Sequence, residues 1–143
     1  MNSDPYDLAR FVHAQDPVIG RVHAELGAGR KRSHWMWFVF PQLIGLGSSA
    51  TARRFAIRSR AEAEHFIRHP LLGPRLARCT RLVNAIDGRT AADIFGFPDY
   101  LKFQSSMTLF AKVADEATVY RKALERFFAG TPDSATLELL EKL

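Results

Sequence analysis

A chain of 143 residues with 47% hydrophobic residues and a formal net charge of +5 suits one folded domain and is too short for two ordinary ones. This composition excludes a disordered protein, and the single cysteine excludes an intramolecular disulfide. The N-terminal sequence MNSDPYDLAR lacks the apolar stretch of a secretion signal, and the longest uncharged apolar run, Trp35–Phe40, is far shorter than a membrane span. We therefore expect a cytoplasmic protein that does not enter a membrane.

Helix-start signals divide the first half of the chain. Asp4-Pro5 and Asp16-Pro17 each combine a capping aspartate with a proline in the first helical position. Ser59, with a glutamate three residues later, forms a capping box that predicts a short helix over 60–68. Each start is followed by apolar residues spaced by three and four, the period of an amphipathic helix.

The second half repeats this pattern. Helices are predicted to start at Pro74, Thr90, Pro98-Asp99 and Thr131-Pro132, and glycines lie between the predicted helices. No stretch alternates apolar and polar residues as a half-buried strand does. The sequence therefore predicts an all-α fold over residues 1–143, a single-domain irregular bundle of about seven to eight short helices with no significant sheet.

The segment Gly29–Gln42 combines cations with aromatic residues. Three cations precede Ser33 and His34, and an apolar run follows them. Ser33 is a suitable N-cap for a turn that begins at His34, and such a turn would direct free backbone N–H groups toward an anion held by the cations. The large apolar side chains of this run are expected in the core, namely Trp35, Met36, Phe38 and Phe40.

Positive charge is concentrated in the same part of the chain. Residues 21–81 contain 12 Lys and Arg against 3 acids, and 15 of the 20 cations in the whole chain are Arg. Arginine matches phosphates and carboxylates with two parallel hydrogen bonds, so this asymmetry indicates an anionic partner. A general preference for Arg over Lys, with most of the side chains solvated, explains the same counts.

Two further segments carry polar residues in apolar surroundings. In residues 41–49, two glycines permit a close backbone approach, and Ser48 or Ser49 can cap the next helix. In residues 97–110, four polar residues interrupt an apolar stretch, and either a ligand or a buried hydrogen-bond network would satisfy them. These four residues are Gln104, Ser105, Ser106 and Thr108.

Other candidates for chemistry are weak. His65 and His69 are four residues apart, but no cysteine or carboxylate is spaced to complete a metal site, so no metal and no cofactor are expected. Cys79 lies on the apolar stripe of its predicted helix and is expected to be buried and inert. Arg75, close to the start of the same helix, opposes the helix dipole, which suggests a role outside the helix.

Long runs of the sequence resemble a bacterial family known as domain-of-unknown-function 1810. The resemblance implies a small all-helical fold and no agreed activity, and nothing in the chain is similar to the disordered repeats of calpastatin, a label some members carry. The resembling runs are AQ at 14–15, GRKRSHWMWFVFPQLIGLG at 29–47, HPLLGPRL at 69–76, IFGFPDYLKFQSSMTLF at 94–110 and TLELL at 136–140.

If these segments converge, they form one basic pocket floored by aromatic rings. Such a pocket suits an anionic, nucleotide-like small molecule of the phosphate or ADP-ribose type, which the protein binds or also processes. For a reaction, His34 or Asp99 would act as the base. The ligand-binding residues would be Gln15, Arg30, Lys31, Arg32, Ser33, Trp37, Gln42, Ser48, Arg75, Lys102, Ser105, Ser106 and Thr108.

Two other functions fit the same features. The basic half would give a nonspecific nucleic-acid-binding module, whose binding would be weak and limited by salt because no base-reading element is visible. An exposed surface of the Trp35–Phe40 run would instead give a protein-interaction adaptor. The sequence leaves open which of these applies, whether the protein is an enzyme, and its oligomeric state.

Overall fold

The computed structural model describes residues 3–143, and the regular structure of these residues is helical. Apart from the helices, one isolated parallel bridge joins Leu43 to Ile57. The all-α prediction is confirmed. In chain order the helices are α1 (Ala9–Gln15), α2 (Ile19–Gly27), α3 (Met36–Val39), α4 (Ala50–Arg54), α5 (Arg60–Arg68), α6 (Leu72–Asn84), α7 (Ala91–Phe95), α8 (Asp99–Val113), α9 (Thr118–Phe128) and α10 (Ser134–Lys142).

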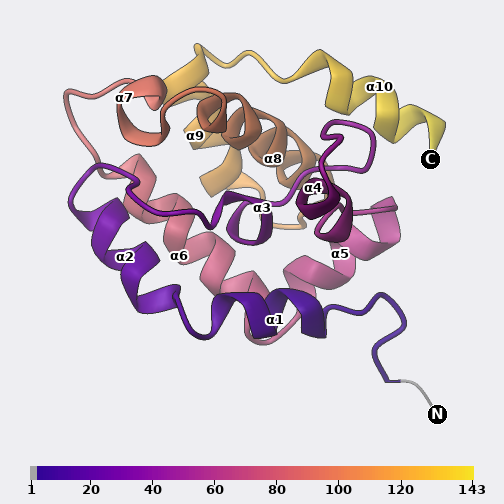
Figure 1. The fold of residues 1–143 in the computed structure, drawn as a ribbon. Helices are drawn as coiled ribbons and strands as arrows, with labels where there is room; N and C mark the ends of the chain where they lie inside the picture. Colours follow the sequence, from indigo (N-terminus) through magenta and orange to yellow (C-terminus); the bar gives the residue numbers. More distant parts are fainter. Residues whose placement is uncertain (1–2) are drawn as a thin grey trace.

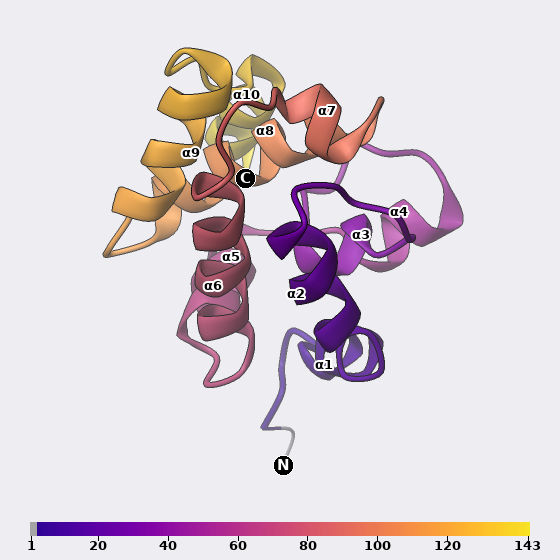
Figure 2. The ribbon, with the colours of Figure 1, turned by 90° about the vertical axis from the view of Figure 1, so that its left-hand side faces the viewer.

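Helix α8 is the longest helix of the described chain, and four others, α5, α7, α9 and α10, pack against it. Helix α6 packs against α2, α5 and α9, and α1 packs against α3. In Figure 1, α1 and α2 form one edge of the molecule and α10 forms the opposite edge. Figure 2, turned by a quarter, shows α3 and α4 on the side opposite α5 and α6. None of the helices in residues 3–143 is both long and apolar enough to cross a membrane.

Aromatic rings fill the centre of the core. Phe40 meets Phe103 edge to face with ring centroids 5.0 Å apart, and Phe95 stacks on Phe103 at 4.6 Å. Aromatic pairs in these geometries contribute about 0.5–1.5 kcal/mol each beyond the area they bury. Trp35 and Met36 are fully buried beside them, as expected for the apolar run. The aromatic part of the basic-aromatic segment therefore anchors the segment to the core.

The predicted number of about seven to eight helices is wrong, because the described residues contain ten. The two left out of that number are α3 and α4, of four and five residues, although the predicted capping by Ser48 or Ser49 is confirmed at Ser49, whose hydroxyl accepts from the Ala52 N–H at 3.0 Å. Helices this short contain no repeat of apolar spacing and are unstable in isolation, so tertiary burial stabilises them. The expected capping role of Ser33 is also wrong: Trp35 occupies the N-cap position of α3, without a side-chain hydrogen bond.

Helix starts were predicted with mixed success. The Thr90 hydroxyl accepts from the Asp93 N–H, and the Asp93 carboxylate accepts from the Thr90 N–H, which completes a capping box. The Ser59 hydroxyl accepts from the Glu62 N–H at 3.0 Å, although Glu62 uses its own carboxylate elsewhere. The last helix begins at the cap Asp133, not at the Thr-Pro pair before it, because only the Asp133 carboxylate accepts from the first turn.

Arg10 on α1 joins three distant parts of the chain. Its Nε donates to the Arg54 carbonyl at 2.9 Å, and its Nη2 donates to the Ala56 carbonyl at 3.0 Å and to Glu62 Oε2 at 2.7 Å. Its Nη1 donates to two carbonyls of the turn before α1. All five N–H donors of the guanidinium are thus bonded. Arg10 fixes the segment between α4 and α5 against α1.

Cys79 is fully buried on α6, as its place in the apolar stripe predicted. Burial raises the pKa of its thiol to about 12, although the charges of Arg78 and Arg75 oppose the rise. A thiol with such a pKa contains almost no thiolate near neutral pH, which is the form that reacts. The structure is therefore consistent with an inert core cysteine.

Candidate functional site

The buried carboxylate of Glu25 on α2 organises the basic-aromatic segment. Its Oε1 accepts from the Arg32 N–H at 2.7 Å, the Ser33 N–H at 3.0 Å and the Trp35 indole N–H at 2.9 Å. Its Oε2 accepts from the Ser33 hydroxyl at 2.6 Å. Sequence reasoning missed this residue, although it is the only acid between residues 17 and 61.

These hydrogen bonds determine the charge of Glu25. Burial raises the pKa of the carboxyl group, but the bonds from Ser33, from the Arg32 N–H and from Trp35 outweigh burial and lower the pKa to about 2. Glu25 is therefore ionised at every pH near neutrality. Its fixed negative charge, and not a bound ligand, satisfies the N–H groups of the turn that was expected to hold an anion.

The cations of this segment separate into one buried and two exposed side chains. Lys31 is 7% exposed and its ammonium lies 2.8 Å from Asp99 Oδ2 on α8. The other carboxylate oxygen, Oδ1, lies 3.4 Å from the ammonium of Lys102. Arg30 and Arg32, by contrast, are exposed, as is the neighbouring His34. Asp99, predicted as a catalytic base, is thus an ion-pair partner of two lysines.

An open pocket of about 440 Å³ lies against α8. Its walls come from α3, the loop before α4, the start of α8 and the start of α10. Five of the predicted ligand-binding residues meet there, namely Trp37, Gln42, Ser48, Lys102 and Ser105. The remaining lining residues are Leu46, Gly47, Ser49, Ala52, Pro98, Leu101, Asp133 and Ala135.

One side of the pocket presents a ring, a cation and an amide. The ammonium of Lys102 lies 5.0 Å from the centroid of the Trp37 ring, within the range of a cation–π interaction. The side-chain amide of Gln42 is half-buried and has no hydrogen-bond partner among residues 3–143. The ammonium has three N–H donors and the described chain offers it one carboxylate oxygen, so donors on this side are available to a ligand.

The other side of the pocket is a joint between α8 and α10. Asp133 Oδ2 accepts from the Ser105 hydroxyl at 3.1 Å, from the Thr136 N–H at 3.1 Å and from the Thr136 hydroxyl. The Thr108 hydroxyl donates to the Gln104 carbonyl and accepts from the Asp133 N–H. Ser105 and Thr108 on α8 therefore belong to a structural network, the alternative to a ligand that the sequence left open, whereas Ser106 does not take part in it.

Several predicted residues lie outside the lining of this pocket. Gln15 donates to the Phe38 carbonyl at 2.7 Å and accepts from Arg75, whose other nitrogen pairs with Asp16 at 2.8 Å. The hydroxyl of Ser106 is buried without a partner among the described residues. The other predicted residues that do not line it are Arg30, Lys31, Arg32, Ser33, His34, Asp99 and Thr108.

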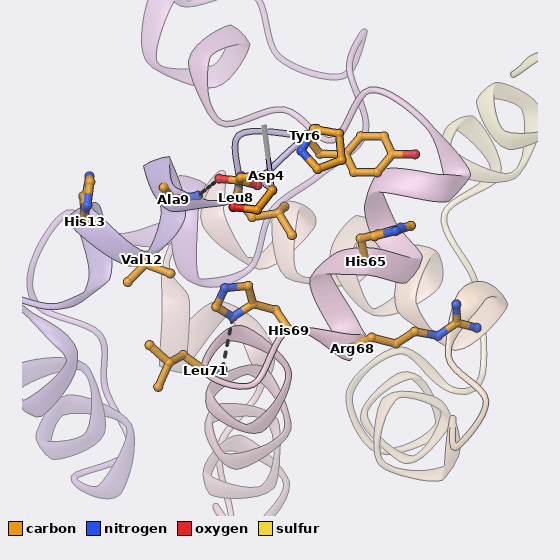
Figure 3. Close-up of a pocket in the computed structure, with 12 residues that line it drawn as sticks. Asp4, Tyr6, Leu8, Ala9, Val12, His13, His65, Arg68, His69 and Leu71 are labelled. Carbon is orange, nitrogen blue, oxygen red and sulfur yellow. Dashed lines mark hydrogen bonds between the residues drawn. The ribbon is translucent and has the colours of Figure 1, made fainter. Parts of the chain in front are cut away.

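A second open pocket, of about 520 Å³, lies between the turn before α1 and the end of α5 (Figure 3). Two of the histidines that line it, His65 and His69, serve local structure. His69 Nδ1 accepts from the Leu71 and Leu72 N–H groups at the start of α6, and His65 Nδ1 lies 2.8 Å from the Ala61 carbonyl. In Figure 3 the two imidazoles point away from each other. Within residues 3–143, no group of three or more His, Cys, Asp and Glu is placed to hold a metal ion.

The fold and the pocket define an all-helical protein with one mixed polar and aromatic pocket against its longest helix. The chain belongs to the family described as "Protein of unknown function (DUF1810)", whose model matches residues 5–140. It is 54% identical to the conserved hypothetical protein Rv1873 from Mycobacterium tuberculosis, whose crystal structure extends to 1.38 Å. The match covers 96% of this chain and 99% of that chain with a TM-score of 0.95. No curated protein matches the sequence.

Proposed function

We propose that this protein binds a small nucleotide-like molecule, with a flat ring and one anionic group, in the pocket beside α8. The observation that carries the proposal is the meeting of Trp37, Lys102 and Gln42 in one pocket. A flat ring stacks on Trp37, the anionic group binds the ammonium of Lys102, and the ring edge hydrogen-bonds to the amide of Gln42. Pockets that bind small molecules combine an apolar wall with a few polar groups in this way.

Charge and hydrogen bonding limit the ligand further. Among the described residues that line the pocket, Lys102 is the only cation and Asp133 is the only acid. A single phosphate or carboxylate suits this balance better than a polyphosphate. Asp133 Oδ1 has no hydrogen-bond partner among residues 3–143, so it offers an acceptor for a ligand hydroxyl group such as that of a ribose. Because neither His34 nor Asp99 lines the pocket, the proposal covers binding and names no reaction.

The test is a thermal-shift and calorimetric titration with adenosine monophosphate, ADP-ribose and inorganic phosphate. A ligand at a hundred times its Kd stabilises the folded state by about 2.7 kcal/mol, which a thermal shift detects readily. Lys102→Gln and Trp37→Leu should each remove the shift. The matched control is Lys112→Gln, which removes an exposed lysine from the same helix and should leave the shift unchanged.

Three outcomes would contradict the proposal. The first is that none of the three compounds stabilises the wild-type protein. The second is that Lys102→Gln and Lys112→Gln weaken binding equally, since the effect would then follow net charge and not the pocket. A further contradicting outcome is that Lys102→Gln loses the shift caused by inorganic phosphate but keeps the shifts caused by the nucleotides. The anionic group of the nucleotides would then bind away from Lys102.

A further inference from the structure

The longest stretch of the chain without an acid, residues 26–61, ends in a group of arginines. Arg53 and Arg54 end α4, Arg58 lies in the linker, and Arg60 begins α5. We call these four residues the linker arginines. All four are exposed, and none forms an ion pair with another residue in 3–143. Their guanidinium groups are therefore available to an external anion.

The linker that carries these residues is held in place. The Arg54 carbonyl accepts from Arg10 Nε at 2.9 Å, and the Arg58 N–H donates to Glu62 Oε1 at 3.3 Å. Arg10 and Glu62 are themselves joined at 2.7 Å, and both side chains are almost fully buried. The Arg10–Glu62 pair therefore holds the backbone at Arg54 and at Arg58, and the linker arginines extend from a backbone that is held in place.

Two of the linker arginines face a common hollow. Arg54 and Arg58 line an open pocket of about 590 Å³ together with Ser59, the N-cap of α5. The pocket also contains the carboxylates of Asp7 and Glu62, of which Glu62 is neutralised by Arg10. Among residues 3–143, Asp7 is then the one acid of this pocket without an ion pair, against two arginines without one.

The position of Arg60 at the start of α5 also favours an external anion as its partner. A cation in the first turn of a helix opposes the helix dipole and does not stabilise the helix. The linker arginines thus contribute no ion pair to the described fold and, at Arg60, act against the helix that follows. An external anion beside Arg60 would offset this unfavourable interaction with the helix dipole.

We propose that the linker arginines bind the phosphate backbone of nucleic acid without reading its sequence. Guanidinium groups bind phosphates with two parallel hydrogen bonds, and several exposed arginines within eight residues of sequence suit a ligand with more than one phosphate. The sequence around them contains no recognisable base-reading motif, so the binding follows charge and salt. This site is separate from the pocket beside α8, which none of the linker arginines lines.

The test measures fluorescence anisotropy of a short labelled DNA duplex of mixed sequence, titrated with the full chain between about 50 and 200 mM salt. The variant is the double substitution Arg54→Gln with Arg58→Gln. The matched control is Arg78→Gln with Arg81→Gln, which removes two exposed and unpaired arginines from α6. Because each neutralised phosphate contributes about 0.9 to the slope of log K against log salt, the variant should lower that slope by about 1.8.

The control should leave the slope unchanged, and circular dichroism should show that both variants are folded. Equal effects of the two double substitutions would overturn the proposal, since binding would then depend on net charge alone. Competition by polyglutamate at the same charge concentration as DNA would also overturn it, because the face would then accept any polyanion. Adenosine monophosphate binding in the Arg54 and Arg58 variant tests the pocket beside α8 independently.

Discussion

Glu25 accepts four hydrogen bonds on one buried carboxylate: three from the consecutive residues Arg32 and Ser33, and one from the indole of Trp35. A buried carboxylate is costly unless donors surround it, and here the donors are more than sufficient to keep it charged. The result is a segment whose backbone is fixed by an acid and whose exposed cations, Arg30 and Arg32, are left to the solvent.

Acid should destabilise the protein over a pH range that is set by the pKa of the Glu25 carboxyl group. The pKa of its carboxyl group is about 2 in the folded chain against 4.5 in the unfolded chain, so the unfolded state binds more protons between these values. The stabilising contribution, roughly 3 kcal/mol, is complete above pH 4.5 and is lost as the pH falls toward 2. Urea denaturation at a series of pH values measures this loss.

The matched variant for this prediction is Glu25→Gln. The amide keeps one acceptor but turns an N–H group toward the donors of Ser33 and Arg32, so we expect lower stability at pH 7, by about 1–3 kcal/mol. We also expect a shallower loss of stability with acid. If wild type and variant lose stability in parallel between pH 4.5 and 2, other carboxylates cause the acid response.

At the scale of elements, α8 is a central helix, since α5, α7, α9 and α10 all pack against it. Its polar residues join it to α10 through the Asp133 carboxylate, which at the same time caps α10. The Asp133 side chain therefore both holds α10 against α8 and caps the first turn of α10.

Asp133→Ala should loosen α10 and leave the rest of the fold intact. The substitution removes the cap, worth about 1 kcal/mol, and the bond from Ser105. Hydrogen exchange should show faster exchange of the α10 amides, with α6 and α9 unchanged. Glu138→Ala, an exposed substitution in the same helix, should leave the exchange of α10 nearly unchanged. Uniformly faster exchange throughout the molecule would show that α10 does not open separately.

At the scale of the whole molecule, the Arg10–Glu62 pair connects α1 to the linker before α5 and to α5 itself, across 52 residues of sequence. Both side chains are almost fully buried, at 11% and 3% exposure. Removing one member of such a pair leaves an isolated buried charge, whereas removing both members leaves none.

Arg10→Met should therefore be more destabilising than its combination with Glu62→Leu. We expect the single substitution to cost about 3–5 kcal/mol of unfolding free energy, and the double substitution to cost less. Denaturant titration of the four members of this double-mutant cycle measures the coupling between the two sites. If the two single substitutions add, the ion pair contributes nothing beyond the packing of each side chain.

The sequence predicted several local features and missed the distant pairings. Two local predictions were also wrong, since Val18 and not Asp16 is the N-cap of α2, and Trp35 and not Ser33 is the N-cap of α3. The caps at Ser59 and Thr90 and the buried stripe of Cys79 depend on residues within one or two helical turns, so spacing alone reveals them. The pair Lys31–Asp99 joins residues 68 positions apart, and no local pattern distinguishes Lys31 from its exposed neighbours. The convergence of Trp37 with Lys102 likewise follows from the tertiary packing of α3 near α8 and not from either segment.

The ion pair between Lys102 and Asp99 has a consequence for the affinity of the proposed ligand. A lysine side chain that is free in solution loses up to roughly 2 kcal/mol of rotamer entropy when a ligand fixes it. In this chain the ammonium is already restrained between Asp99 Oδ1 at 3.4 Å and the Trp37 ring at 5.0 Å. Much of that entropy is lost when the protein folds, so a molecule that enters the pocket meets a preorganised cation and keeps more of its binding energy.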